Sequence, residues 1–328
     1  MSSILLRSSF RERISLNTTS ADTVAYTLLW SEDFDDFPVS STLTASALST
    51  YVDNFESASS TGGDGVYEDA GIVLFDGSNV MESRYPEGEC CVEGNIIADW
   101  PTAGNNYTTS GTGVDWRAYI TAAGESDPNP PRRLVISMNI YLDPLFENSN
   151  GFKLPALCTE KGSGWDNGTM RMMIVDYSSG TEFDPQYYSH AYWNGYAQPV
   201  VTQANTKTIT PLSYFPRGEW VNVAMVLDAG TINAVPANGW VEFFINGEMI
   251  VEDRSNVPFI ATGDVECLTY IEFTTFMGGS SSGYMSPRDQ YMYIDDAVVY
   301  YLDDSDDYTR PSSEGDKLYL PPEANWPR

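Results

Sequence analysis

The sequence predicts an all-β protein, a sandwich of two antiparallel sheets with an arm at each end of the chain. Three observations predict this fold class. The 328 residues include 21 Tyr, 8 Trp and 26 Gly, a composition typical of strands and turns. Apolar residues recur at every second position in several segments. No segment carries the apolar repeat of a helix of three turns, and there is no internal repeat.

Alternation predicts the individual strands. Over residues 134–142, Leu, Ile and Met alternate with mostly polar residues, which is typical of a half-buried strand. Residues 221–227 and 291–301 are predicted strands as well. Residues 241–251 predict a hairpin that turns at Asn-Gly, because both central residues of a type I′ turn need a positive φ.

Composition excludes several classes of protein. The chain has 17 Lys+Arg against 46 Asp+Glu, a formal net charge of −29, so a general nucleic-acid binder is excluded. A hydrophobic content of 42% is enough for a core. No stretch approaches the roughly 18 apolar residues of a membrane span. The apolar run at residues 4–6 is too short for a signal-peptide core, so we recognise no signal peptide.

Composition also divides the chain. Residues 1–25 are predicted as an N-terminal arm, which either anchors the protein to a larger assembly or is a frayed terminus. Residues 26–303 are predicted as the β-domain, and residues 304–328 as a proline-containing tail.

We expect no metal and no cofactor. There is one His in the chain, so a zinc site is not predicted. The acidic runs 33–36 and 303–307 contain candidate Ca²⁺ ligands, but solvated surface is the preferred interpretation. Four cysteines, Cys90, Cys91, Cys158 and Cys267, allow three pairings, and the general tendency of cysteine favours free or buried thiols.

Two segments carry candidate cationic residues. Residues 151–157 place Lys153, one of only four lysines, between apolar neighbours. In residues 169–175, alternation puts Thr169 and Arg171 on the same side of a predicted strand.

A third segment, residues 187–193, contains the only histidine. Tyr188, His190 and Tyr192 share one side of this segment by alternation. Residues 177–186 contain turn signals, so a hairpin can bring these residues next to the preceding strand.

A cation pair beside a Tyr/His pair suits β-elimination on a uronic acid. Lys153 or Arg171 neutralises the sugar carboxylate and acidifies the adjacent C–H. Tyr192 or His190 then removes that proton, and a tyrosine donates one to the leaving glycosidic oxygen. From the residues alone, a surface or ion-paired arginine and a packed histidine remain open alternatives.

The order of the motifs resembles polysaccharide lyase family fourteen, the alginate- and glucuronan-cleaving jelly-roll enzymes. The resemblance covers roughly residues 130–300. It rests on Gly-Phe-Lys-Leu-Pro-Ala-Leu at 151–157, Thr-Met-Arg at 169–171, His-Ala-Tyr at 190–192, Arg-Gly-Glu-Trp at 217–220, Asn-Gly at 246–247, Phe-Thr-Thr-Phe-Met-Gly-Gly at 273–279 and Tyr-Ile-Asp-Asp at 293–296.

The resemblance implies a concanavalin-like β-jelly roll and a set of site residues. The implied catalytic residues are Lys153, Arg171, His190 and Tyr192, and the implied substrate-binding residues are Thr169, Tyr188 and Trp193. Four positions depart from the family pattern: Phe152 and Ala156 replace glycines, Thr169 replaces Ser, and His190 stands where the family tends to have Tyr.

The sequence therefore predicts a carbohydrate-active protein that binds or cleaves a uronate-containing polysaccharide, located outside the cell or on a virion surface. The alternative is a non-catalytic virion surface protein, either capsid decoration or fibre, that contacts other assembly proteins through residues 1–25. A secreted lectin is a third hypothesis, because Asn17, Asn106 and Asn167 lie in glycosylation sequons.

Overall fold

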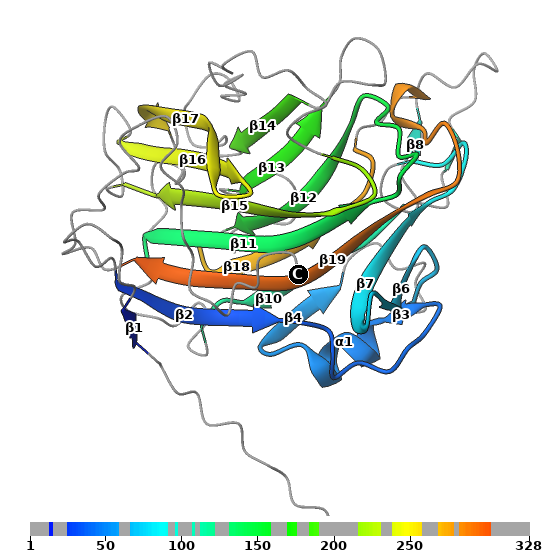
Figure 1. Ribbon diagram of the computed structural model, residues 1–328, viewed down its shortest axis with the longest axis horizontal. Coiled ribbons are helices and arrows are strands. Elements are labelled where there is room, and N and C mark those ends of the chain that lie inside the picture. Colours follow the sequence, from blue (N-terminus) through cyan, green and yellow to red (C-terminus); the bar gives the residue numbers. More distant parts are fainter. Residues whose placement is uncertain are drawn as a thin grey trace, which may run out of the picture.

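The computed structural model describes residues 13–15, 25–58, 66–90, 96–97, 107–108, 112–121, 131–158, 169–175, 184–189, 216–230, 238–257, 268–278 and 282–302. Two antiparallel sheets make up most of this part of the chain, one in front of the other in Figure 1. The predicted all-β jelly-roll sandwich is confirmed.

Within the described ranges, the larger sheet has nine strands. Its main order is β1 (Arg13–Ser15), β2 (Ala25–Glu32), β19 (Gln290–Leu302), β11 (Arg133–Leu142), β15 (Trp220–Asp228), β16 (Gly239–Ile245) and β17 (Glu248–Val257). Strand β7 (Ser78–Tyr85) pairs with β19, and β6 (Ala70–Phe75) pairs with β7. Strand β1 lies within the predicted N-terminal arm, and the division into arm, domain and tail stays a prediction.

The smaller sheet, which positions the candidate site, has six strands among the residues that the structure describes. Its order is β14 (Asp184–Ser189), β13 (Thr169–Val175), β12 (Gly151–Cys158), β18 (Tyr270–Thr274), β10 (Asp115–Tyr119) and β4 (Phe55–Ala58). Two minor pairs are β3 (Leu43–Thr44) with β5 (Val66–Tyr67) and β8 (Ile96–Ile97) with β9 (Tyr107–Thr108).

Helices are short in the part of the chain that the structure describes. Helix α1 (Ala45–Tyr51) begins where the Thr44 side chain accepts a hydrogen bond from the amide of Ala47, and η3 (Ser282–Tyr284) is a single 3-10 turn. Among these residues no helix is long and apolar enough to span a membrane.

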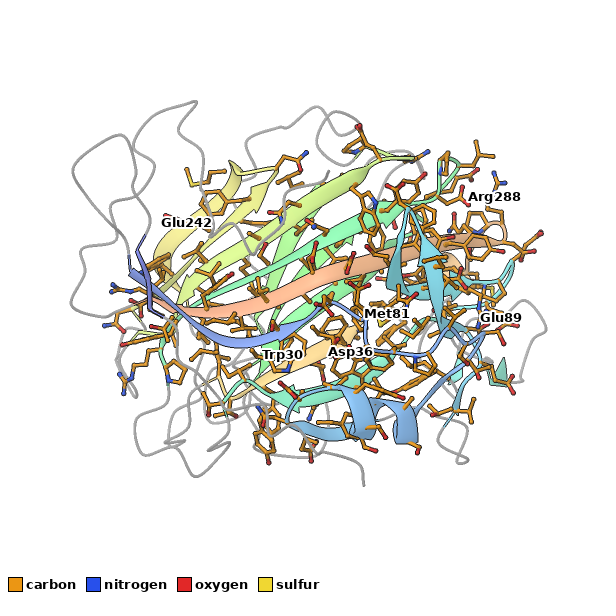
Figure 2. All side chains as sticks on the ribbon, turned by 60° about the horizontal axis from the view of Figure 1, so that its bottom comes forward. Trp30, Asp36, Met81, Glu89, Glu242 and Arg288 are labelled. Atoms are coloured by element: carbon orange, nitrogen blue, oxygen red, sulfur yellow. The ribbon has the colours of Figure 1, made fainter. Side chains whose placement is uncertain are left out.

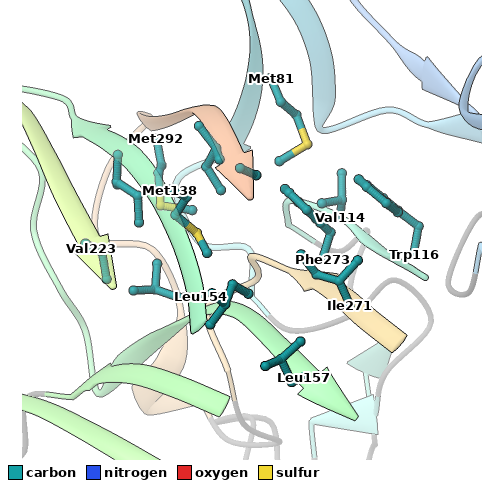
Figure 3. Packing of buried hydrophobic residues seen from close by; sticks show 14 of the residues in the cluster. Met81, Val114, Trp116, Met138, Leu154, Leu157, Val223, Ile271, Phe273 and Met292 are labelled. Carbon is teal, nitrogen blue, oxygen red and sulfur yellow. The ribbon is translucent and has the colours of Figure 1, made fainter. Parts of the chain in front are cut away.

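The main core fills the space between the two sheets (Figure 3). Trp116 of β10 stacks on Phe273 of β18, with ring centroids 4.3 Å apart and an interplanar angle of 4°. Trp30 of β2, labelled in Figure 2, contacts both rings at centroid distances of 6.5 and 6.0 Å. These aromatic contacts join the two sheets. Each such pair stabilises the fold by about 1 kcal/mol, in addition to the free energy gained by burying the area of the rings.

Strand β11 is buried on both sides, so the prediction of a half-buried strand is wrong. Its inward residues join the main core, while Val135, Ser137 and Asn139 on the other side are also buried. A second apolar cluster occupies that outer side of the nine-stranded sheet, around Val135 and Phe244. Asn222 donates hydrogen bonds to Ser137 and Asn139 at 3.0 and 3.1 Å, which satisfies the buried polar groups.

The predicted Asn-Gly hairpin is confirmed. Asn246 and Gly247 connect β16 to β17 with φ values of 49° and 76°, as a type I′ turn requires.

Cys90 departs from the expectation of free or buried thiols, because it is not a thiol. It is disulfide-bonded and fully buried, with Tyr284 and Met285 packed against it. The other three cysteine side chains lie outside the described residues.

Candidate active site

The six-stranded sheet has one side in the core and one side turned away from it, which we call the outer face. Trp116, Phe152, Ile271 and Phe273 belong to the core. Because side chains alternate along a strand, the outer face carries the positions between them. These positions are Asp115, Arg117, Tyr119, Lys153, Ala156, Tyr270, Glu272 and Thr274.

Lys153 is the best-defined cation of the outer face. Its amide donates to the carbonyl of Phe276 at 3.1 Å, and its Nζ lies 4.0 Å from the centroid of the Phe276 ring. Only 4% of Lys153 is exposed. A Cβ added to Gly278 would lie 2.7 Å from Cε of this lysine. Phe276 and Gly278 therefore enclose the lysine side chain, and the cation–π contact stabilises its charge.

The predicted hairpin between the arginine and tyrosine segments is confirmed. Strands β13 and β14 pair antiparallel, with Arg171 opposite Tyr188. Strand β14 ends the order of the sheet among the described residues, and this edge position tolerates Pro185, which cannot donate to a neighbouring strand.

Cross-strand register brings position 171 close to Lys153. Ala156 of β12 lies opposite Arg171, and Lys153 lies opposite Met173, with a bulge between the two β12 residues. The lateral spacing of strands and a two-residue offset give about 8 Å between the backbones at 153 and 171.

The structure places some of the predicted site residues and not others. Lys153 is described in full. Thr169, Arg171 and Tyr188 are placed by their backbones on β13 and β14, at positions that alternation assigns to the outer face. Three predicted residues lie outside the described part of the chain: His190, Tyr192 and Trp193.

Phe152 replaces a glycine of the family pattern, but its ring does not block the outer face. Phe152 is fully buried in the core and packs edge-on against Phe146, with ring centroids 5.2 Å apart. The large side chain is accommodated because it points to the opposite side of β12 from Lys153.

Two further pairs on the outer face were not predicted from the sequence. Arg117 of β10 forms an ion pair with Glu272 of β18 at 2.6 Å. Beside it, the rings of Tyr119 and Tyr270 stack with centroids 4.5 Å apart, and Tyr270 donates to the Tyr119 hydroxyl at 3.1 Å. The available signal was the polar–apolar alternation of residues 115–119 and 270–274.

The opposite side of the sandwich offers a weaker candidate. The rings of Tyr141, Trp220 and Tyr293 lie in register across the nine-stranded sheet, but Phe75 stacks on Tyr293 at 4.3 Å and contacts the other two. These aromatic surfaces are thus partly used in packing against each other.

Nearby on the same side, burial and the charge of Asp296 raise the pKa of Asp295 to about 7. Among the described residues, no group of three or more His, Cys, Asp or Glu side chains is placed to hold a metal ion.

A known family matches the part of the chain that forms most of the six-stranded sheet. The polysaccharide lyase 14 family matches residues 99–297, which is more than half of the chain. The chain belongs to this lyase family. The matched residues include every strand of the six-stranded sheet except β4, and therefore all of the outer-face residues named above.

Solved structures of lyases share the fold. The marine PL-14 alginate lyase from Aplysia kurodai superposes with a TM-score of 0.59 at 16% identity, covering 84% of this chain and 99% of that one. Alginate lyase Aly36B gives 0.56 at 14% identity, covering 82% and 95%. Alginate lyase vAL-1 from Chlorella virus gives 0.51 at 14% identity, covering 80% and 100%. No curated protein sequence matches the chain.

Proposed function

We propose that this member of the polysaccharide lyase 14 family cleaves a uronate-containing polysaccharide by β-elimination on the outer face of the six-stranded sheet. The observation that carries the proposal is the register of β12, β13 and β14, which gathers positions 153, 171 and 188 on adjacent strands.

In the proposed reaction, Lys153 and Arg171 neutralise the uronate carboxylate and so acidify the C–H on the adjacent carbon. His190 or Tyr192 removes that proton, and Tyr192 donates a proton to the leaving glycosidic oxygen. The C–H and C–O bonds break and a C=C bond forms, so the step needs no oxidant or reductant. Thr169, Tyr188 and Trp193 are assigned to substrate binding.

The surroundings of Lys153 support its role. A lysine held by Phe276 and Gly278 keeps its ammonium in one place, which is what preorganised charge stabilisation requires. The disulfide at Cys90 supports a location in an oxidising compartment, as expected of an extracellular or virion-surface protein.

The test measures the ultraviolet absorbance of the unsaturated product on a panel of uronate polysaccharides. Lys153→Met and Arg171→Ala should each lower turnover about a hundredfold, because each removes one preorganised charge. Arg133→Ala is the matched control, since Arg133 is ion-paired with Asp228 on the nine-stranded sheet and should not affect turnover.

The absence of product on every polymer, from folded protein, would remove the lyase proposal and leave the non-catalytic surface protein. If Arg171→Ala unfolds the protein, the arginine is a structural ion-pair partner and its assignment fails.

A further inference from the structure

Three aromatic side chains form a row on the nine-stranded sheet, on the side turned away from the six-stranded sheet. Tyr141 of β11 is paired in register with Trp220 of β15 on one side and with Tyr293 of β19 on the other. Their neighbours along each strand belong to the main core, so the three rings point to the opposite side. Each ring is partly exposed. Because neighbouring strands are about 4.8 Å apart, the row is about 10 Å long.

Phe75 adds a fourth, partly exposed ring from the β6–β7 hairpin. It stacks on Tyr293 with ring centroids 4.3 Å apart and contacts the other two rings at 4.9 and 5.9 Å. The hairpin turns at Asp76 and Gly77, whose φ values of 53° and 98° are both positive, as in a type I′ turn. The four rings, which we call the aromatic platform, are thus held by strands and a tight turn, and little side-chain entropy is lost when a ligand binds to them.

The aromatic platform is separate from the apolar clusters of the molecule. Its rings belong neither to the main core nor to the second cluster on the outer side of the nine-stranded sheet. The hydrogen-bonded pair Asn139 and Asn222 lies next along β11 and β15, between the platform and that second cluster. Large aromatic rings that gather at a partly exposed place are typical of interaction sites.

The polar groups at the platform suit a sugar. The Tyr293 hydroxyl is hydrogen-bonded to Glu82. Burial, followed by the charges of Asp143 and Asp76, raises the pKa of Tyr141, so its hydroxyl stays protonated. Aromatic rings beside hydroxyl and carboxylate groups can contact the apolar face and the hydroxyl edge of a sugar at the same time.

The charges that act on the Tyr141 ring favour a neutral sugar over a uronate. Asp76 is exposed at the turn of the hairpin, and Asp143 follows β11 and accepts a hydrogen bond from the amide of Leu145 at 2.7 Å. Among the described residues neither carboxylate forms a salt bridge, whereas Glu82 is ion-paired with Arg84 at 3.4 Å. Two carboxylates repel a third on the ligand, but they accept hydrogen bonds from neutral hydroxyl groups.

We propose that the aromatic platform is a second carbohydrate-binding site, which takes a neutral sugar chain on the side of the sandwich opposite to the proposed catalytic face. Both sheets, which pack about 10 Å apart, lie between the platform and Lys153, so one sugar residue does not contact both. The platform holds the protein on a neutral polysaccharide and leaves the other face accessible. This inference goes beyond the proposed lyase function and does not depend on it.

The test is calorimetric titration with neutral oligosaccharides of glucose, mannose and xylose and with an oligouronate of equal length, in the Lys153→Met background. At least one neutral oligosaccharide should bind more tightly than the oligouronate. Tyr141→Ala and Trp220→Ala should each weaken that binding about three- to tenfold, because each removes one ring. Asp76→Asn should raise affinity for the oligouronate about two- to fivefold, because it removes a repelling charge and asparagine tolerates a positive φ.

Two controls separate contact with the sugar from a structural effect. Tyr51→Ala removes an exposed tyrosine of helix α1 that packs against Phe37, and it should leave binding unchanged. Trp220→Phe keeps an aromatic ring and should retain most of the affinity, while the change in tryptophan fluorescence on titration should be lost. Thermal unfolding confirms that each variant is folded.

Several results would overturn the platform as a sugar site. If the folded protein binds none of the neutral oligosaccharides, or if Tyr51→Ala weakens binding as much as Trp220→Ala, the four rings only attach the β6–β7 hairpin to the sheet. Self-association of the wild-type protein that Trp220→Ala abolishes would make the platform an interface between copies of the chain. A lack of turnover on every polymer would defeat the lyase proposal alone, because the titrations need no turnover.

Discussion

Gly278→Ala tests directly whether the lysine side chain is held in place by its surroundings. A Cβ at position 278 would lie 2.7, 3.2 and 3.3 Å from Cε, Cγ and Cδ of Lys153. Gly278 is not among the residues with positive φ, so its backbone accepts alanine. The strain therefore falls on the buried lysine stem, and overpacking of this kind costs about 1–3 kcal/mol.

The assay is a double-mutant cycle measured by urea unfolding. Gly278→Ala should lower the free energy of unfolding by about 1–3 kcal/mol in the wild-type background and by almost nothing in a Lys153→Ala background. Under the proposed lyase function, turnover gives a second measurement, because displacing a group of the proposed site by about 1 Å costs about a hundredfold in rate.

Lys153→Met is the control, since methionine keeps a stem of similar length without the charge. The cost of Gly278→Ala should persist in this background. Equal destabilisation in the wild-type and Lys153→Ala backgrounds would refute the reasoning, because the added methyl group would then clash with something other than the lysine.

Two further predictions concern buried polar groups. Because burial and Asp296 raise the folded-state pKa of Asp295 to about 7, the folded state binds this proton more tightly than the unfolded chain, and stability falls as the pH rises from about 4 to about 7. In thermal unfolding, Asp295→Asn should therefore stabilise the protein more above about pH 7 than near pH 4. Equal stabilisation at the two pH values would contradict the raised pKa of Asp295. Tyr85→Phe should destabilise by about 1–3 kcal/mol in urea, because it leaves the buried carbonyl of Thr275 without the 2.5 Å hydrogen bond from the tyrosine. Unchanged stability would show that the carbonyl finds another donor.

Local signals in the sequence predicted the strands and the type I′ hairpin well. Alternation and Asn-Gly chemistry act over a few residues, so they can be recognised without knowing the fold. The same alternation wrongly predicted a half-buried strand for β11, because the second side of this strand is buried as well. Whether Val135 is exposed depends on what covers the sheet, and a strand's own pattern does not contain that information.

The residues of the candidate site also form two groups: those that local sequence identifies and those that only the fold brings together. Lys153 and Arg171 were predicted because each stands out within its own segment, and the pairing of β13 with β14 followed from a short connection. Arg117 and Glu272 are 155 residues apart, and they meet only because β10 pairs with β18. Nothing local to either strand identifies that partner, so this ion pair could be found only in the structure.

The net charge of −29 is compatible with the proposed uronate substrate only where cations are placed locally, at the proposed site. Long-range attraction is absent, so recognition of a uronate has to come from contacts within a few ångströms, where screening by salt is weakest. In the proposed site, Lys153 enclosed against Phe276 supplies one such contact, while Arg117 is ion-paired with Glu272 on the strand next to β12. In the proposed site, the local placement of cations therefore allows a strongly acidic chain to bind an anionic sugar.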